Sequence, residues 1–274
     1  MLSNTHKKQF ALFYLLCLLV NIAWLFYNNL LLHQVQPLLF INRLDITRTI
    51  IMLSGLQQTL ISHHWLAVLL DVLFILLPLL LLLAVNKKKA VLLITVLTSF
   101  IALVYAVYIT AFSYLSIEMF IPWILMPLVF YNKTDKGFYF TMHSFRIIFI
   151  LIFFSAGLWK LRVGGVFNTD EMSGILLLQH KQILAANTDS FFAHTIQWLI
   201  LHPAISYMLY LLGLMAELLF VIGFFTRRYD WLMNMAFIGF LLSDLLLMQI
   251  NYFNWLVFAG LLYFSKFKQP ENAV

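Results

Sequence analysis

Long apolar runs constrain this chain more than any other feature of its sequence. The run at residues 65–85, WLAVLLDVLFILLPLLLLLAV, has about the 20 residues that a helix needs to cross a bilayer. Of the 274 residues 63% are hydrophobic and 10% are charged, whereas soluble domains have roughly 25% charged residues. The backbone of a membrane span must satisfy its own hydrogen bonds, and the alternating pattern of a membrane barrel is missing. The sequence therefore excludes an ordinary soluble domain and indicates helices.

The runs predict an all-α, polytopic helical membrane protein with a single transmembrane domain over residues 1–274. We expect about eight transmembrane helices, with short interfacial helices on the outer face. Some runs are short, so one of them could be tilted or partly buried. The first run follows Lys7 and Lys8 but is too long for a signal peptide and lacks its cleavage site, which favours an uncleaved helix. The expected spans are 10–32, 65–85, 90–112, 117–132, 146–161, 203–225, 231–249 and 251–265.

The distribution of basic residues predicts the topology. If the N-terminus is inside, most of the 17 Lys and Arg residues fall on the same side of the membrane. Because cytoplasmic loops carry an excess of Lys and Arg, we expect both termini in the cytoplasm. The residues on that side are Lys7, Lys8, Lys87, Lys88, Lys89, Lys133, Lys136, Arg146, Arg227, Arg228, Lys266 and Lys268.

Two long segments are expected on the outer side. In residues 33–64 apolar side chains recur at helical spacing, which is typical of a helix in the membrane interface. In residues 162–202 the stretches SGILLLQHKQILAA and SFFAHTIQWLILH predict two short apolar helices. The second helix is expected to be capped by Asp189 or Ser190 and to end before Pro203.

Several kinds of chemistry find no support in the sequence. Cys17 is the single cysteine, so an internal disulfide and a cysteine-based metal site are excluded. The histidines lack HExxH-type spacing, and we predict no metal. No GxSxG motif, phosphate-binding glycine loop or nucleic-acid module is present, so we expect no nucleic-acid partner.

Ionisable residues inside spans are the strongest functional candidates, because each costs about 2.5–3.5 kcal/mol on insertion scales. Glu217 falls near the middle of its span, where a carboxylate cannot reach water, and the others fall toward the outer half. Each also has a structural interpretation: Lys160 beside Trp159 could be a cation that snorkels to the interface, and the acids could pair or cap locally. The five residues are Asp71, Glu118, Lys160, Glu217 and Asp244.

Lys160 suggests a specific chemistry. Desolvation lowers the pKa of a buried lysine, so that a neutral amine could accept a proton near pH 7. Its natural substrate in a membrane is a lipid-soluble weak acid such as a quinol. We therefore predict catalytic roles for Lys160, Glu217 and Asp244 in an enclosed, outward-facing pocket. The candidate ligand-binding residues are Arg162, Trp159, His194 and His202.

Two stretches carry a family resemblance. IFFSAGLWKLRVGG resembles a segment of vitamin K-dependent gamma-carboxylases and of their bacterial relatives, the horizontally transferred transmembrane domain (HTTM) proteins. GLMAELLFVIGFFTRR looks like a second helix of that family, and Asp244 stands where the family has a histidine. The matching residues are Phe153, Phe154, Ala156, Gly157, Lys160, Leu161, Gly213, Glu217, Leu218, Gly223, Arg227 and Arg228.

The resemblance implies a quinol-dependent enzyme. In the carboxylases the matching lysine is assigned as the base that deprotonates vitamin K hydroquinone, so that role would fall on Lys160. The cofactor would be a quinol or menaquinone-like lipid, and the location would be the bacterial cytoplasmic membrane. The sequence does not decide whether the chain is catalytic.

Two other interpretations stay open. The chain could be a non-catalytic accessory protein for the maturation or export of a secreted peptide. It is also similar, more weakly, to DoxX-like membrane proteins, which share the Gly-x-x-Lys helix end at Gly157 and Lys160 and are linked to quinone redox partners. The expected partners are therefore membrane lipids, with a secreted peptide or a membrane redox protein as further candidates.

Overall fold

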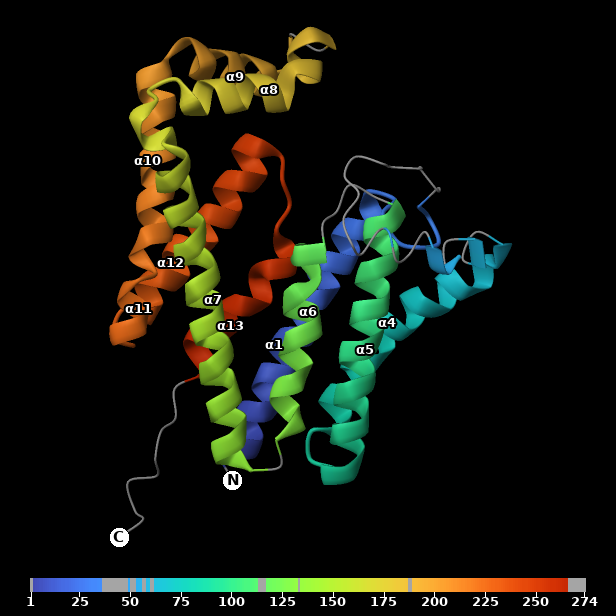
Figure 1. Cartoon of the computed structure of the whole chain (residues 1–274). Helices are drawn as coiled ribbons and strands as arrows, with labels where there is room; N and C mark the ends of the chain where they lie inside the picture. The colour runs from blue at the N-terminus through green and yellow to red at the C-terminus, as the bar shows by residue number, and fades with distance from the viewer. Residues whose placement is uncertain are drawn as a thin grey trace. The chain divides into compact units, whose positions relative to one another are not determined.

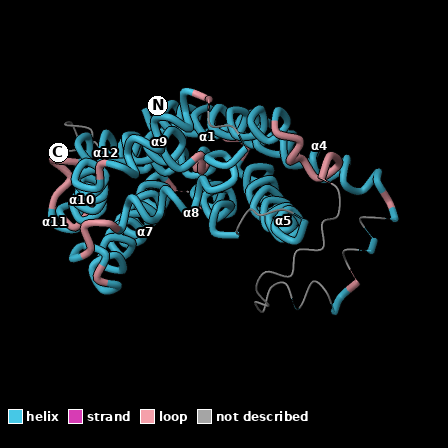
Figure 2. Tube along the Cα trace, turned by 90° about the horizontal axis from the view of Figure 1, so that it is seen from above, coloured by secondary structure: helices cyan, strands magenta, loops and turns pink. Residues whose placement is uncertain are grey.

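The computed structural model describes residues 2–35, 49, 53–55, 58–59, 62–112, 117–132, 134–186 and 189–265. Figure 2 shows that helices joined by short loops make up this part of the chain. The chain forms two compact units, one of residues 1–143 with 253–274 and one of residues 144–252. The fold class is therefore all-α, as predicted. Whether the two units form one transmembrane domain stays a prediction.

Six of the described helices are long and apolar enough to cross a membrane. The two remaining predicted spans, 117–132 and 251–265, are helical but contain only the shorter apolar helices Ile121–Tyr131 and Phe253–Phe264. Length and composition thus support six of the eight expected spans. The six are Thr5–Tyr27, His64–Ala84, Lys89–Ile109, Asp135–Val163, Pro203–Phe225 and Asp230–Met248.

The first unit packs aromatic side chains between its helices. Tyr14 donates a hydrogen bond to the carbonyl of Trp123 at 3.3 Å, and Phe74 stacks on Tyr105 with ring centroids 4.2 Å apart. Such pairs add to the burial energy of large apolar side chains. The helices of this unit are α1 (Leu2–Tyr27), α4 (His64–Ala84), α5 (Lys88–Phe112), η1 (Ile117–Phe120), α6 (Ile121–Leu125), η2 (Met126–Tyr131), η5 (Phe253–Phe258) and α13 (Ala259–Phe264).

The second unit is built on three long helices that Figure 1 shows running alongside one another, α7, α10 and α12. The boundary between the units falls within α7. The elements are α7 (Asp135–Val163), η3 (Gly165–Phe167), α8 (Glu171–Ala186), α9 (Phe191–Leu201), α10 (Pro203–Leu219), α11 (Ile222–Phe225), α12 (Asp230–Ser243) and η4, a π-helix (Asp244–Met248).

Helix α7 corrects the sequence prediction for the fifth span. We expected a short span at 146–161, but the helix runs over Asp135–Val163 and has 29 residues. Asp135 in its first turn suits the positive end of the helix dipole. Arg146 therefore lies in the middle part of a helix and not at the start of a span, and 1% of its surface is exposed. Its charge is compensated within the protein, which explains how it is accommodated there.

The two short helices predicted in residues 162–202 are present, and their place on the outer side stays a prediction. They are α8 and α9, and the Ser190 hydroxyl caps α9 by accepting a hydrogen bond from the Ala193 N–H at 3.1 Å. Helix α9 ends at Leu201, before Pro203. Most of the predicted interfacial helix in residues 33–64 lies outside the described residues.

Candidate functional site

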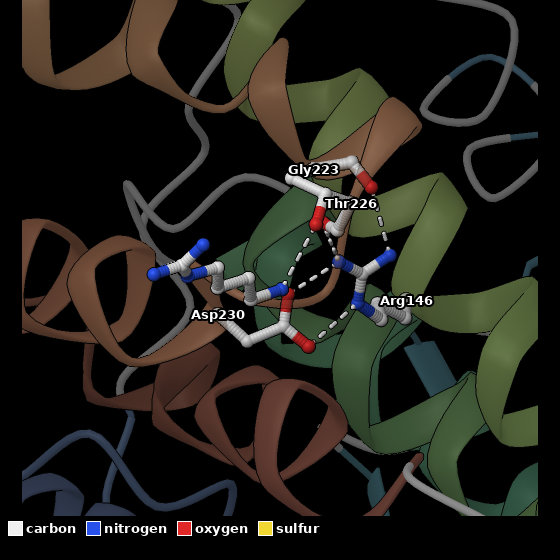
Figure 3. A network of polar contacts seen from close by, with 5 residues as sticks. Arg146, Gly223, Thr226 and Asp230 are labelled. Carbon is white, nitrogen blue, oxygen red and sulfur yellow. Dashed lines mark hydrogen bonds and ion pairs between the residues drawn. The ribbon is translucent and has the colours of Figure 1, made fainter.

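Side chains of α7 contact the segment from α10 to the π-helix at three successive levels along the second unit. At the first level Arg146 of α7 is buried against the turn between α11 and α12 (Figure 3). Its guanidinium pairs with the Asp230 carboxylate and donates to the carbonyls of Gly223 at 3.0 Å and Thr226 at 3.4 Å. The side chains of both Arg146 and Asp230 are 1% exposed. The Asp230 carboxylate thus compensates the buried charge of Arg146, and the guanidinium provides a hydrogen-bond donor for two carbonyls at a helix end.

The second level is aromatic. Phe153 of α7 lies 4.8 Å from Phe220 and 5.1 Å from Phe237 between ring centroids, and Phe149 packs on the same two rings. Phe149, Phe220 and Phe237 are fully buried or nearly so. This layer contains no ionisable group of its own and separates the Arg146 pair from the charges above it.

The third level brings together the predicted catalytic residues. Lys160 Nζ of α7 lies 2.7 Å from Glu217 Oε1 of α10, and the two side chains are 34% and 3% exposed. Asp244, at the start of the π-helix, is close enough to interact electrostatically with both Lys160 and Glu217. Glu217 Oε2 is buried without a hydrogen-bond partner. The cluster therefore combines one cation with two carboxylates that influence each other electrostatically, and Glu217 Oε2 can accept a proton or hydrogen bond.

Gly157 makes this close approach of α7 and α10 possible. A Cβ at Gly157 would lie 3.0 Å from Leu218 Cδ2 and 3.2 Å from Glu217 Cβ. A Cβ alone would require its neighbours to shift by a few tenths of an ångström, and a larger side chain would push the two helices apart. Because Lys160 lies one turn beyond Gly157, separating the helices would also separate the ammonium from the Glu217 carboxylate.

Three aromatic side chains lie near the cluster, and none of them was predicted from the sequence. Lys160 Nζ lies 5.7 Å from the ring centroid of Phe240. Tyr210 interacts electrostatically with Glu217, and Tyr252 does so with Asp244. Burial, and then the Asp244 carboxylate, raise the pKa of Tyr252 above its usual value, so its phenol stays a hydrogen-bond donor at neutral pH.

The π-helix gives the cluster an unusual backbone. It spans Asp244–Met248, and Gln249 follows with a left-handed φ of 53°. Single π-turns occur frequently at functional sites, because they re-aim side chains at the cost of regular hydrogen bonding. Here the irregular turn begins at Asp244, the residue that completes the charged cluster.

The predicted ligand-binding residues lie apart from these contacts. The Arg162 guanidinium carbon lies 5.2 Å from the ring centroid of Trp159, which is 60% exposed. His194 and His202 are exposed on and just after α9, and the Nδ1 atom of each contacts the carbonyl four residues earlier. None of these contacts joins them to Lys160 or Glu217. Their role in binding a ligand stays a prediction.

The other ionisable candidates have different surroundings. Asp71 is buried in the first unit and accepts hydrogen bonds from the backbone N–H groups of Leu32 and His33, with His33 Nδ1 at 2.7 Å. These contacts join the α4 side chain to the segment that follows α1, which is a structural role. The side chain of Glu118 lies outside the described residues. Among the described residues no group of His, Cys, Asp and Glu could hold a metal ion.

The chain was also compared with known proteins. It matches no protein-family model, no curated protein and no solved structure. The structure and the comparisons together identify a helical protein with six candidate membrane spans, and the resemblance to the HTTM family stays a proposal.

Proposed function

We propose that this chain is an integral membrane protein that binds a lipid-soluble weak acid of the quinol type at the Lys160, Glu217 and Asp244 cluster and takes up its proton. The observation that carries the proposal is that the two oxygens of the Glu217 carboxylate have different surroundings. One oxygen is paired with Lys160 at 2.7 Å, and the other is buried and has no partner. A buried acceptor without a donor is costly, and a ligand hydroxyl would satisfy it.

The charges of the cluster suit a ligand that loses a proton. When a quinol O–H bond breaks, the proton passes to a carboxylate and the electron pair stays on the ligand oxygen. The Lys160 ammonium then stabilises the new anion. Because Lys160 is ion-paired, the structure favours the charged lysine in this role, with Glu217 or Asp244 as the proton acceptor.

The neighbours of the cluster suit a ring compound. Phe240 offers an aromatic face close to Lys160, and Tyr210 and Tyr252 interact with the two acids. Binding sites for small ligands commonly combine apolar walls with a few converging polar groups. Oxidation of the bound anion would require a separate electron acceptor, for which a membrane redox protein is our candidate.

Copurified lipids test this proposal. We expect the purified protein to carry an isoprenoid quinone, detected by mass spectrometry of the extract, and Glu217→Gln to lose most of it. The matched control is Asp170→Asn, which removes an exposed carboxylate of the same unit and should retain the ligand. A wild-type protein without quinone, or a Glu217→Gln protein with an unchanged amount, would refute the proposal. A copurified secreted peptide would instead support the accessory interpretation.

The proposed location is the bacterial cytoplasmic membrane with both termini inside, and labelling can test the orientation. Lys88 and Gln182 would then lie on opposite sides of the membrane. We expect a membrane-impermeant thiol reagent to label a cysteine at position 182 in intact spheroplasts, and a cysteine at 88 only after lysis. Cys17 is buried and can be replaced by alanine in both variants. Labelling of both positions from the same side would contradict the orientation.

A further inference from the structure

We propose that the exposed face of α9 lies in the headgroup region of the bilayer and inserts its apolar side chains between phospholipids. This surface is formed by Phe191, Trp198 and Leu201, whose exposed fractions are 89%, 48% and 69%. The inference requires that α10 crosses the membrane, and it is independent of any quinol. In this inference the binding partner of the α8–α9 hairpin is the surface of the lipid bilayer.

The three residues share one side of α9. They are separated by seven and three positions along the helix, so their side chains point in similar directions. The opposite side of α9 is already used, because Ile196 and Leu199 are buried against Leu176 of α8. The hairpin therefore has its own small core, and the apolar outer face of α9 does not take part in that core.

Hydrogen bonds hold the hairpin at the end of the spanning helices. His180 Nε2 of α8 lies 2.7 Å from the carbonyl of Leu247, and the Ser206 hydroxyl of α10 donates to the carbonyl of Leu199 at 2.5 Å. Figure 1 shows α8 and α9 lying across the ends of α7 and α10. Where α10 enters the bilayer, α9 must therefore lie at the level of the membrane surface.

The apolar surface of α9 continues along α10. Helix α9 ends at Leu201 and α10 begins at Pro203, and exposed apolar side chains then recur every three or four residues. Ile205, Met208, Leu212 and Met215 are 40%, 58%, 59% and 66% exposed. Exposed apolar residues thus continue along the chain from α9 into the candidate span α10, which favours lipid over a protein partner.

The polar groups of the same face suit lipid headgroups. The Trp198 and His202 rings lie 4.6 Å apart between centroids, and His202 Nδ1 lies 2.7 Å from the Trp198 carbonyl. Tryptophan is enriched at the membrane–water interface, because its ring is apolar and its N–H requires a hydrogen-bond partner. His194 lies between Phe191 and Trp198 on this face and offers a further polar group at headgroup depth.

Spin labels can measure the depth of this face. The full chain, with Cys17→Ala, would be reconstituted in vesicles of phosphatidylcholine and phosphatidylglycerol, with single nitroxide labels at Phe191, Leu201 or Met208. Collision rates with oxygen, which enters the bilayer, and with a nickel chelate, which stays in water, give the depth of each label. The matched control is Gln182, an exposed polar position of α8.

We expect the oxygen-to-nickel ratio to be several-fold higher at Phe191 and Leu201 than at Gln182, and highest at Met208. Nickel accessibility at Phe191 and Leu201 equal to that at Gln182 would place the face in water and overturn the inference. Protection of both labels from both reagents would indicate a protein contact and would overturn it as well. A high ratio at Met208 in either case would show that the span itself is intact.

Discussion

Replacing Asp230 with leucine is expected to remove about 3–5 kcal/mol from the free energy of unfolding. The substitution leaves the Arg146 guanidinium buried without its carboxylate, while the guanidinium still contacts the carbonyls of Gly223 and Thr226. Breaking one side of a buried ion pair is costly, because the remaining charge has lost both water and its partner. Unfolding in detergent micelles with increasing dodecyl sulfate, followed by circular dichroism, measures the loss.

Control variants separate this effect from a general loss of surface charge. Arg228→Met removes an exposed arginine of the same turn, and we expect a change of about 0.5 kcal/mol or less. Arg146→Met should cost at least as much as Asp230→Leu, because two carbonyls also lose their donor. The double variant should cost clearly less than the sum of the single ones, since the two residues interact directly. Additive losses, or a loss at Asp230 no larger than the control, would contradict a coupled pair.

The parts of the fold that were predicted correctly are those with a local signal. Apolar runs located the six long helices, and Ser190 and Pro203 marked the limits of α9. The start of α7 was missed, because residues 135–145 mix polar and apolar side chains and lower the local hydropathy. Arg146 was consequently placed at the first residue of the span and counted with the basic residues of the cytoplasmic side, although a buried partner 84 residues away explains its position.

The candidate site shows the same division between local and tertiary information. Lys160, Glu217 and Asp244 could be chosen from the sequence, because ionisable groups inside apolar runs are expensive and rare. The aromatic neighbours Phe240 and Tyr210 could not be chosen in the same way. Aromatic residues make up 17% of the chain, and only the packing of α7 against α10 and α12 decides which of them face the cluster.

The arrangement of charges in the second unit has a physical rationale. The Arg146 pair and the Lys160 cluster occupy two levels with buried phenylalanines between them. The Arg146–Asp230 pair is almost fully buried and saturated with hydrogen bonds, so it is suited to stabilising the turn between α11 and α12. The Lys160 cluster has a half-buried lysine, an unpaired oxygen on Glu217 and an irregular π-turn that begins at Asp244. We therefore expect the Lys160 cluster to be the reactive site and the Arg146–Asp230 pair to stabilise the fold.

Substitutions of Lys160 distinguish two possible mechanisms for this site. If a neutral amine is the base, arginine cannot replace it, because a guanidinium does not give up its proton. If an ammonium paired with Glu217 stabilises the bound anion, arginine can form the same pair and retain much of the function. The ion pair leads us to expect the second outcome for Lys160→Arg, whereas Lys160→Met should fail under either mechanism.

Binding of a short-chain menaquinol analogue to the protein in nanodiscs provides the measurement. We expect Lys160→Met to bind about 10- to 100-fold more weakly, because a hydrogen bond to a charged group contributes roughly 1.5–3 kcal/mol. Lys160→Arg should lose clearly less, and the exposed control Lys181→Met should bind as wild type does. Equal losses for methionine and arginine would favour the neutral amine. Wild-type affinity in Lys160→Met would show that the lysine is only an interfacial anchor, and the cluster would then lose its assigned function.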